Sequence, residues 1–421
     1  MAEIEEGGVT HGRAALGWFA LAWLLAAVVG GYAAATMEPF HVVRVPGIEP
    51  ARHGGLAHHM LDPWQHWDGL WYLRIARSGY AADGSAAFFP LYPGLIRAVA
   101  PLTGGDALAA ALLISWLSLA GALVVLDRLL SAEFGRSVAT TALLLLVSFP
   151  TAFYFHAAYT ESLFLLLAAG SFLAARRRRW LLAGFLGLLA GLTRSAGLLF
   201  APVLAIEAWS QTHANGAPGG WRALASRAGL AALARAPGRS LLGAAIPLLA
   251  VPALLVLFDR TLDDPLAFSS AQRLWERHPA APWSALYDGI RVLLPGGPRL
   301  LEPIAGAPPR LDRYVAGFLE SNAYNLAAAL GGLALAGLAL RRLPASFGAF
   351  ALGGVLLPLF SPSRVLPLYS MPRFLLVLFP LFVALALPLE ARPRLRSAVL
   401  IASAALQGLF TVRFALWYWV A

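Results

Sequence analysis

The sequence of 421 residues contains no cysteine, which excludes disulfide bonds and thiolate metal sites. Lysine is absent as well, so all 32 basic side chains are arginines and the formal net charge of +10 depends on them alone. Charged residues of both signs make up only 13% of the chain, about half the share of roughly 25% found in soluble domains. This scarcity of charge, together with 59% hydrophobic residues, predicts a membrane protein.

No cleavable signal peptide stands out in the sequence, and no short-period repeat is visible. The first apolar run, residues 14–35, exceeds the core of a signal peptide and ends without a convincing cleavage site, so it is interpreted as a retained spanning helix. The arginines fall at the ends of apolar runs and in short loops rather than in one patch, which argues against a nucleic-acid partner.

Apolar runs of spanning length recur along the chain, among them residues 138–155, 180–206 and 374–389. They predict an all-α polytopic membrane protein with about eleven transmembrane helices in a single domain, residues 1–421. The run at residues 180–206 is best divided at Thr193-Arg194 into two shorter helices. The predicted order is a first span (14–36), a first outer loop with interfacial helices (37–102), spans two to seven (103–258), a long outer loop (259–322) and the C-terminal spans (323–421).

The arginines predict the orientation of this bundle. Arginine-rich connections at residues 128–136, 176–179, 222–239, 341–342 and 392–396 alternate onto one side, which is expected to be cytoplasmic. The polar loops at residues 37–102, 159–161, 259–322 and 361–373 then converge on the other face. We therefore predict a multi-pass protein of the cell membrane with its site on the extracytoplasmic face.

The first outer loop contains a tryptophan-rich stretch around one carboxylate. In a continuous helix, Trp64, Trp67 and Trp71 share one face, and Asp68 projects from that same face. A carboxylate in such a position loses hydration, which a partner, a ligand or a chemical role must offset. The alternative is that Asp68 caps the N-terminus of a helix beginning at Gly69.

The same loop carries two motifs that resemble the signature of the PIG-V mannosyltransferases, the second mannosyltransferase of GPI-anchor assembly and its prokaryotic relatives: Trp67-Asp68-Gly69…Gly79-Tyr80 and Ala87-Phe88-Phe89-Pro90-Leu91-Tyr92-Pro93. Two further blocks, at residues 158–164 and 191–197, agree in the same order. Segments 264–275 and 372–382 are reminiscent of prokaryotic members. The chain departs from the eukaryotic pattern at Leu70-Trp71, where those enzymes have Glu-His, and at Ala196, where they have asparagine; both differences bear on the acceptor more than on the chemistry.

The resemblance implies a GT-C fold with the catalytic acid in the first outer loop and a polyprenyl-phosphate-linked sugar as donor. Such a transfer needs a base for the acceptor hydroxyl and positive charge for the departing phosphate. Asp68 is the predicted base, and a single carboxylate suits an inverting displacement. Because arginine binds two phosphate oxygens at once, the candidate phosphate-binding residues are Arg74, Arg194, Arg364 and Arg373.

Several of these candidates have a structural alternative. Arg194 interrupts an apolar run, which indicates a function, but it could instead pair with Glu161. Glu161 opens a span, where the helix dipole favours a carboxylate whatever else it does. The aromatic rings either stack on sugars or form an interfacial belt. The candidates for binding the sugar or the acceptor are His66, Trp67, Trp71, Tyr72, Tyr80, Glu161 and Gln272.

The histidines of the first loop, His53, His58, His59 and His66, form with Asp62 the one metal-like cluster of the sequence. Their spacing fits no standard zinc pattern, so we predict no metal ion and no cofactor, with a divalent cation as the alternative.

The function predicted from the sequence is that of a mannosyltransferase that acts on a lipid or glycan acceptor at the outer face of the bilayer. One alternative is a related transferase with another sugar or a protein acceptor. A second is a flippase or permease without covalent chemistry, although transporters usually carry paired repeats with matching broken helices, and the sequence has neither.

Overall fold

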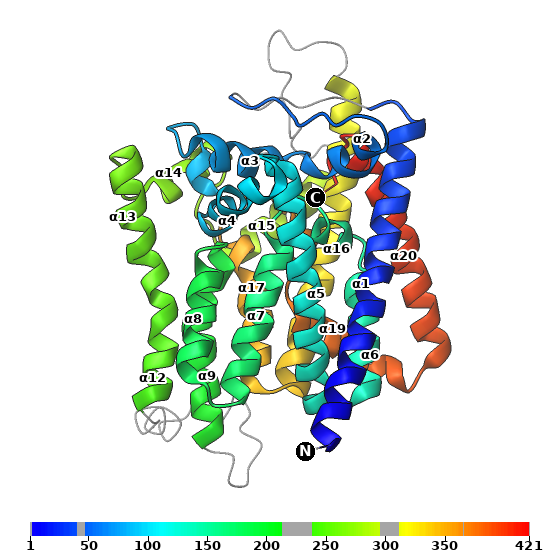
Figure 1. Cartoon of the computed structure of the whole chain (residues 1–421), viewed down its shortest axis with the longest axis vertical. Helices are drawn as coiled ribbons and strands as arrows, with labels where there is room; N and C mark the ends of the chain where they lie inside the picture. Colours follow the sequence, from blue (N-terminus) through cyan, green and yellow to red (C-terminus); the bar gives the residue numbers. More distant parts are fainter. Residues whose placement is uncertain (1, 40–46, 213–237, 295–310, 365, 421) are drawn as a thin grey trace.

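The computed structural model describes residues 2–39, 47–212, 238–294, 311–364 and 366–420. These residues form helices that stand side by side, with several shorter helices gathered at one end (Figure 1). No strand is assigned within these ranges, and an isolated antiparallel bridge joins Arg277 and Ser363. The all-α prediction is therefore confirmed for the described chain.

Five segments of the described chain are long and apolar enough to cross a membrane: Gly17–Thr36 in α1 (Ala2–Thr36), α5 (Ala107–Phe134), Gly238–Leu262 across α12 (Gly238–Ala245) and α13 (Ala250–Leu262), Asn322–Arg342 in α16 (Leu311–Arg342), and α20 (Pro393–Ala415). Shorter apolar helices are α6 (Arg136–Val147), α8 (Trp180–Gly191), α17 (Ala345–Leu359) and α19 (Phe379–Glu390). The bundle also contains α7 (Glu161–Arg176) and α9 (Phe200–Thr212). This arrangement is consistent with a polytopic membrane protein, while the count of eleven spans stays a prediction.

Several predicted runs are interrupted in the structure. The run at 180–206 divides as predicted, because α8 ends at Gly191, a 3₁₀ turn η5 (Ser195–Leu199) follows, and α9 begins at Phe200. The run at 138–155 is not one helix: α6 ends before Pro150, which cannot continue a helix, and a 3₁₀ turn η4 (Ala152–Phe155) follows. The run at 374–389 is likewise divided into α18 (Met371–Leu376) and α19, which has a proline in its first turn.

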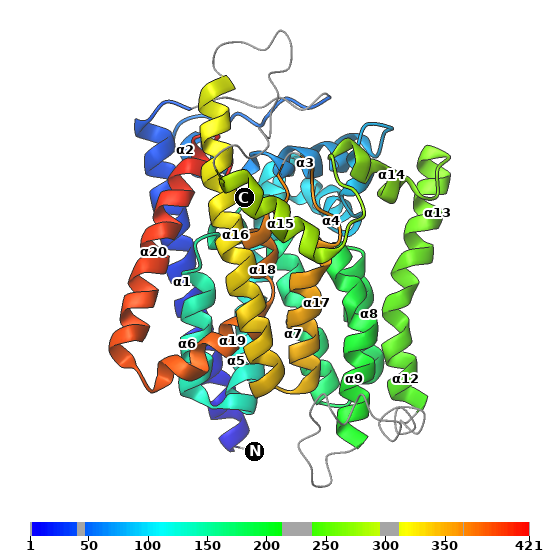
Figure 2. The ribbon, with the colours of Figure 1, turned by 180° about the vertical axis from the view of Figure 1, so that it is seen from behind.

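The short helices lie at the end of the bundle opposite the N-terminus. They are α2 (Leu56–Leu61), α3 (Asp68–Ser78), α4 (Leu91–Val99) and α14 (Ala267–Leu274), while α15 (Pro282–Leu293) packs against α16 and α17 (Figures 1 and 2). The arginine-rich connections α7–α8, α16–α17 and α19–α20 lie at the N-terminal end. These arginine-rich connections thus lie at the end opposite the first loop, as predicted, and the assignment of that end to the cytoplasm stays a prediction. Most of the predicted connection at 222–239 lies outside the described residues.

The prediction of one helix through Trp64, Trp67 and Asp68 is wrong. Trp64 lies in a 3₁₀ turn, η1 (Asp62–Gln65), and Trp67 adopts a left-handed backbone with φ 56° before α3 begins. A continuous helix would bond the Asp68 N–H to the Trp64 carbonyl. Instead that carbonyl accepts from Ala158 N–H at 2.8 Å, and the Asp68 N–H donates to the Tyr159 hydroxyl at 3.2 Å. Tertiary bonds from the segment before α7 therefore break the helix at this point.

The alternative of an Asp68 N-cap is also wrong. The residue that caps α3 is Trp67, no side-chain capping bond is formed, and Asp68 is already the first residue of the helix. Its carboxylate is consequently not used to satisfy the helix terminus.

Candidate active site

A cavity of about 370 Å³ lies where α3, α14, α17 and α18 meet the turn η5. Its lining combines charged groups with a larger number of apolar side chains, which is typical of a ligand-binding pocket. The polar lining consists of Asp68, Tyr72, Thr160, Thr193, Arg194, Ser195, Ser269, Gln272, Arg277, Ser361, Tyr369 and Arg373; the apolar lining includes Phe89, Leu198, Phe268, Leu357 and Leu378.

Asp68 is held in this cavity by an arginine 305 residues away in the chain. Arg373 Nη1 donates to Asp68 Oδ2 at 2.6 Å, and both side chains are nearly buried. In the described chain no hydrogen bond reaches the other carboxylate oxygen, Oδ1, and Asp68 lines the cavity. One oxygen is thus fixed while the other is available to a ligand.

Glu161 connects two arginines behind the cavity. Its Oε1 accepts from Arg194 Nη1 at 2.9 Å and lies 3.1 Å from Arg373 Nε. Glu161 is fully buried at the first position of α7, where the helix dipole favours its negative charge. A buried carboxylate needs compensation of this kind, so Glu161 serves to hold Arg194 and Arg373 in place.

Aromatic rings surround the Arg373 guanidinium. Its Cζ lies 5.3 Å from the ring centroid of Tyr159 and 5.6 Å from that of Tyr154. The Tyr159 hydroxyl donates to the His66 carbonyl at 3.1 Å while it accepts from Asp68 N–H, so it also fixes the start of α3. The Asp68–Arg373 pair is therefore pre-organised by its surroundings before any ligand binds.

Part of the chain matches a known protein family. Residues 37–214 match the family model Mannosyltransferase (PIG-V). This part of the chain is PIG-V-like. The match confirms the resemblance predicted from the motifs and supports a glycosyltransferase, and a mannosyltransferase in particular. No curated protein and no solved structure matches the chain significantly.

The PIG-V match covers Asp68, Glu161 and Arg194, whereas the remaining charged groups of the site, Arg277 and Arg373, lie beyond it. The second half of the chain therefore completes the polar surface that the PIG-V-like segment begins.

The residues predicted as site residues fall into two groups. Those that line the cavity are Asp68, Tyr72, Arg194, Gln272 and Arg373, and Glu161 supports them from behind. Arg74 instead pairs with Asp83 at 2.5 Å and lies over Trp71, and Arg364 is exposed to solvent; neither lines the cavity. The rest of the predicted set outside the lining is His66, Trp67, Trp71 and Tyr80.

His66 is enclosed by the C-terminal segment. Its Nδ1 lies 3.0 Å from the Phe414 carbonyl and therefore donates to it, and its ring stacks on Trp417 at a centroid distance of 3.7 Å. Burial lowers the pKa of His66 to about 3, so the ring is neutral at physiological pH. A neutral, enclosed imidazole joins α3 to the end of α20 and does not reach the cavity.

The remaining aromatic candidates pack on other aromatic side chains. Trp71 stacks on Phe88 at 5.7 Å and meets Trp275 edge-on at 5.6 Å, while Trp67 contacts Trp419 at 4.9 Å. The hydroxyl of Tyr80 donates to the Phe88 carbonyl at 2.8 Å. Of the predicted aromatic candidates Tyr72 lines the cavity, and Trp71 packs behind Phe88 and Trp275, which line it too.

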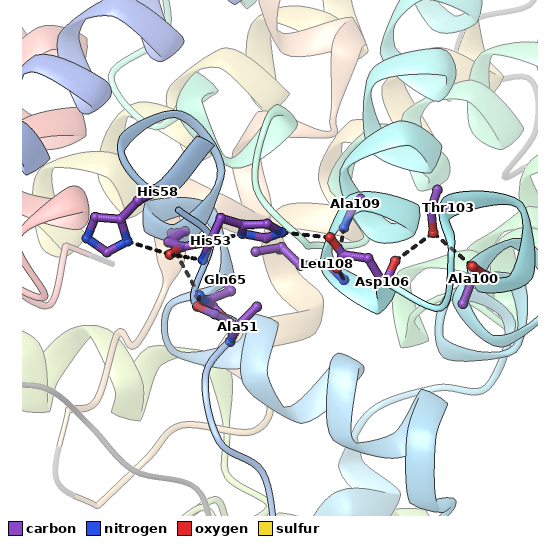
Figure 3. Close-up of polar contacts among 10 residues, drawn as sticks. Ala51, His53, His58, Gln65, Ala100, Thr103, Asp106, Leu108 and Ala109 are labelled. Carbon is purple, nitrogen blue, oxygen red and sulfur yellow. Dashed lines mark hydrogen bonds and ion pairs between the residues drawn. The ribbon is translucent and has the colours of Figure 1, made fainter. Parts of the chain in front are cut away.

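Two histidines of the predicted cluster, His53 and His58, form a hydrogen-bonded network with acidic side chains (Figure 3). His53 Nδ1 lies 2.5 Å from Asp62 Oδ1, and its Nε2 lies 2.7 Å from Asp106 Oδ2. His58 Nδ1 lies 2.6 Å from the other oxygen of Asp62. In the part of the chain that the structure describes, no group of three or more ligating side chains could hold a metal ion. The prediction of no cofactor stays a prediction.

This network attaches the first loop to the bundle. Asp106 is the N-cap of α5, where its Oδ1 accepts from the backbone N–H groups of Leu108 and Ala109. His53 bonds carboxylates through both ring nitrogens, which requires the doubly protonated imidazolium. Hydrogen bonds to Asp62 and then Asp106 raise the pKa of His53 above its ordinary value of 6.5. The attachment is therefore strongest when His53 is charged.

We expect the stability of the protein in detergent to fall as the pH rises from about 6.5 through the raised pKa of His53. The sign follows from the shift: a raised folded-state pKa adds stability that is complete below the unfolded value and is lost above the folded one. Thermal unfolding of the wild type and of His53→Gln between pH 6 and pH 9 measures this effect. The variant is expected to unfold at a lower temperature at pH 6 and to depend less on pH. Identical pH profiles would contradict the assignment.

Sequence reasoning missed Arg277, Tyr369 and Thr160, which also line the cavity. Arg277 follows directly after the segment 264–275 that resembles prokaryotic family members, and this proximity is the one signal that could have pointed to it. By residue type alone it does not differ from the other loop arginines of the chain.

Proposed function

We propose that the protein is a membrane glycosyltransferase of the GT-C type that moves mannose from a polyprenyl-phosphate donor to a lipid or glycan acceptor, with inversion, on the extracytoplasmic face. The family match supports sugar transfer. The position of the cavity at the end of the bundle opposite the arginine-rich connections supports the outer face.

The observation that carries the proposal is the Asp68 carboxylate in the cavity, with Oδ2 bonded to Arg373 and Oδ1 open. In the proposed step, Asp68 Oδ1 takes the proton of the acceptor hydroxyl while the acceptor oxygen forms a bond to the anomeric carbon of the sugar. The bond from that carbon to the phosphate oxygen breaks, and its electron pair stays on the phosphate. No covalent intermediate with the protein is needed, which corresponds to inversion.

The mixed lining of the cavity suits the two ends of such a donor. Gln272, Thr160 and Tyr72 offer hydrogen bonds to sugar hydroxyl groups, and Leu198 and Leu357 offer apolar contacts to the first prenyl units. Arg194 and Arg373 hold the carboxylates in place and contribute positive charge near the leaving phosphate.

The proposal is tested with purified protein in detergent, a polyprenyl-phosphomannose and an extract of membrane lipids. A transferase is expected to release polyprenyl phosphate and to form a mannosylated product, which mass spectrometry detects. A flippase or permease needs a sealed vesicle and leaves its substrate unchanged, so an intact donor in detergent together with donor movement in vesicles would reject the transferase. The lipids and glycans that disappear when the gene is deleted identify the acceptor.

A further inference from the structure

The loop after α14 places one more cation at the cavity. The helix ends at Leu274, and Glu276 adopts a left-handed backbone with φ 56°. Arg277 N–H then donates back to the Gln272 carbonyl at 2.9 Å and Glu276 N–H to the Arg273 carbonyl at 3.0 Å, which is the bonding pattern of a Schellman cap. The backbone at Arg277 is thereby fixed on its N-terminal side.

A second segment fixes the same backbone from the other side. Arg277 forms the antiparallel bridge to Ser363, Arg364 N–H donates to the Glu276 carbonyl at 2.9 Å, and His278 N–H donates to the Pro362 carbonyl at 3.1 Å. The backbone around this loop residue is thus hydrogen-bonded both to its own helix and to the segment at residues 362–364. Such rigidity is what a group that must meet a ligand in one position requires.

The Arg277 side chain lines the cavity without a carboxylate of its own. Its Cζ lies 5.5 Å from the ring centroid of Tyr369 and 5.6 Å from that of Phe374, and no ion pair joins it to any acidic group in the described ranges. The guanidinium groups of Arg194 and Arg373 lie 5.6 and 5.7 Å from the same Phe374 centroid. Three cations therefore surround one aromatic ring.

The charges of this group do not cancel. Asp68 and Glu161 contribute two negative charges, and Arg194, Arg277 and Arg373 contribute three positive charges. Arg194 and Arg373 are each bonded to a carboxylate, so the surplus positive charge resides on Arg277. Burial lowers the pKa of the partly buried Arg277, and the positive charges of Arg373 and Arg194 lower it further, although a guanidinium stays charged at neutral pH.

We propose that Arg277 binds the phosphate of the substrate and distinguishes a phosphate monoester or diester from an uncharged lipid. The inference rests on the proposed function, because the phosphate in question is that of the sugar donor. A donor phosphodiester has one negative charge, which equals in size the single surplus positive charge of the three arginines and two carboxylates. When Asp68 takes the acceptor proton, the site loses one negative charge just as the released phosphate monoester gains one. The positive charge of the site therefore equals the negative charge of the phosphate both before and after the transfer.

The test measures binding of farnesyl phosphate, farnesol and inorganic phosphate to the detergent-purified protein by isothermal titration calorimetry. The wild type is expected to bind farnesyl phosphate more tightly than either other probe. Arg277→Gln is expected to weaken farnesyl phosphate binding by roughly 10- to 100-fold and to leave farnesol unaffected. Arg277→Lys, which keeps the charge without the planar fork, is expected to fall between the two. The matched control is Arg273→Gln, an exposed arginine on α14 outside the lining, which is expected to bind as the wild type does.

Wild-type affinity for farnesyl phosphate in both folded Arg277 variants would overturn the inference. So would equal affinities for inorganic and farnesyl phosphate, because the site would then take a free phosphate rather than a lipid phosphate. The role of Arg277 and the transferase activity can be tested independently. Asp68→Asn is expected to keep farnesyl phosphate binding while it loses transfer. A wild type that binds farnesyl phosphate through Arg277 but transfers no sugar would reject the transferase and leave the role of Arg277 intact.

Discussion

Replacing Asp68 by asparagine is expected to lower the rate of sugar transfer by about 10²- to 10⁴-fold, the usual contribution of a general base. Asparagine keeps the shape of the side chain and an oxygen that can accept from Arg373, so the bundle is expected to remain folded. The measurement is release of polyprenyl phosphate from a polyprenyl-phosphomannose at saturating donor, with thermal unfolding recorded on the same preparation.

Asp83→Asn provides the matched control for this prediction. Asp83 lies in the same loop, is partly exposed, and pairs with Arg74 away from the cavity lining. Its variant is expected to retain transfer close to the wild-type rate. Retained turnover in a folded Asp68→Asn protein would remove Asp68 from the role of base.

Replacing Arg373 by glutamine is expected to destabilise the protein by about 3–5 kcal/mol, because a buried ion pair that loses one partner leaves an uncompensated charge. Two carboxylates, Asp68 and Glu161, lose a partner at once. Transfer is also expected to fall below detection, since Asp68 loses the contact that orients it. Thermal unfolding in detergent and the transfer assay measure the two effects.

A double variant separates the two effects of this change. Adding Asp68→Asn to Arg373→Gln removes the carboxylate charge that is left unpaired, since Glu161 keeps its ion pair with Arg194, and is expected to restore part of the lost stability without restoring transfer. Arg273→Gln, in which an exposed arginine is replaced, is expected to change neither quantity. An Arg373→Gln protein as stable as the wild type would show that the buried pairs contribute nothing to the fold.

The sequence was a good guide to the elements of the fold, because apolar runs and helix breakers act locally. The division of the run at residues 180–206 and the short helices of the first loop follow from such local signals. The break at Trp67 does not, because it depends on tertiary bonds to Ala158 and Tyr159 and on a positive φ that a tryptophan rarely adopts.

The candidate site could be predicted only in part for a similar reason. Asp68 stood out as a carboxylate among aromatic residues, and a pairing of Arg194 with Glu161 was one of the alternatives that the sequence left open; the structure contains that pair. The exclusion of Arg74 from the cavity depends on Asp83, and the inclusion of Arg277 depends on a cap and a bridge to residues 362–364. Contacts between distant segments leave no mark in the pattern of one chain.

The 305 residues between Asp68 and Arg373 limit how the protein can be divided. A fragment that ended with the PIG-V-like segment at residue 214 would contain both carboxylates of the site, Asp68 and Glu161. Of the two arginines that pair with them it would contain Arg194 and lack Arg373. During synthesis the same imbalance persists until α18 has been made, so the first half of the bundle cannot close around its own charged centre while the second half is still emerging.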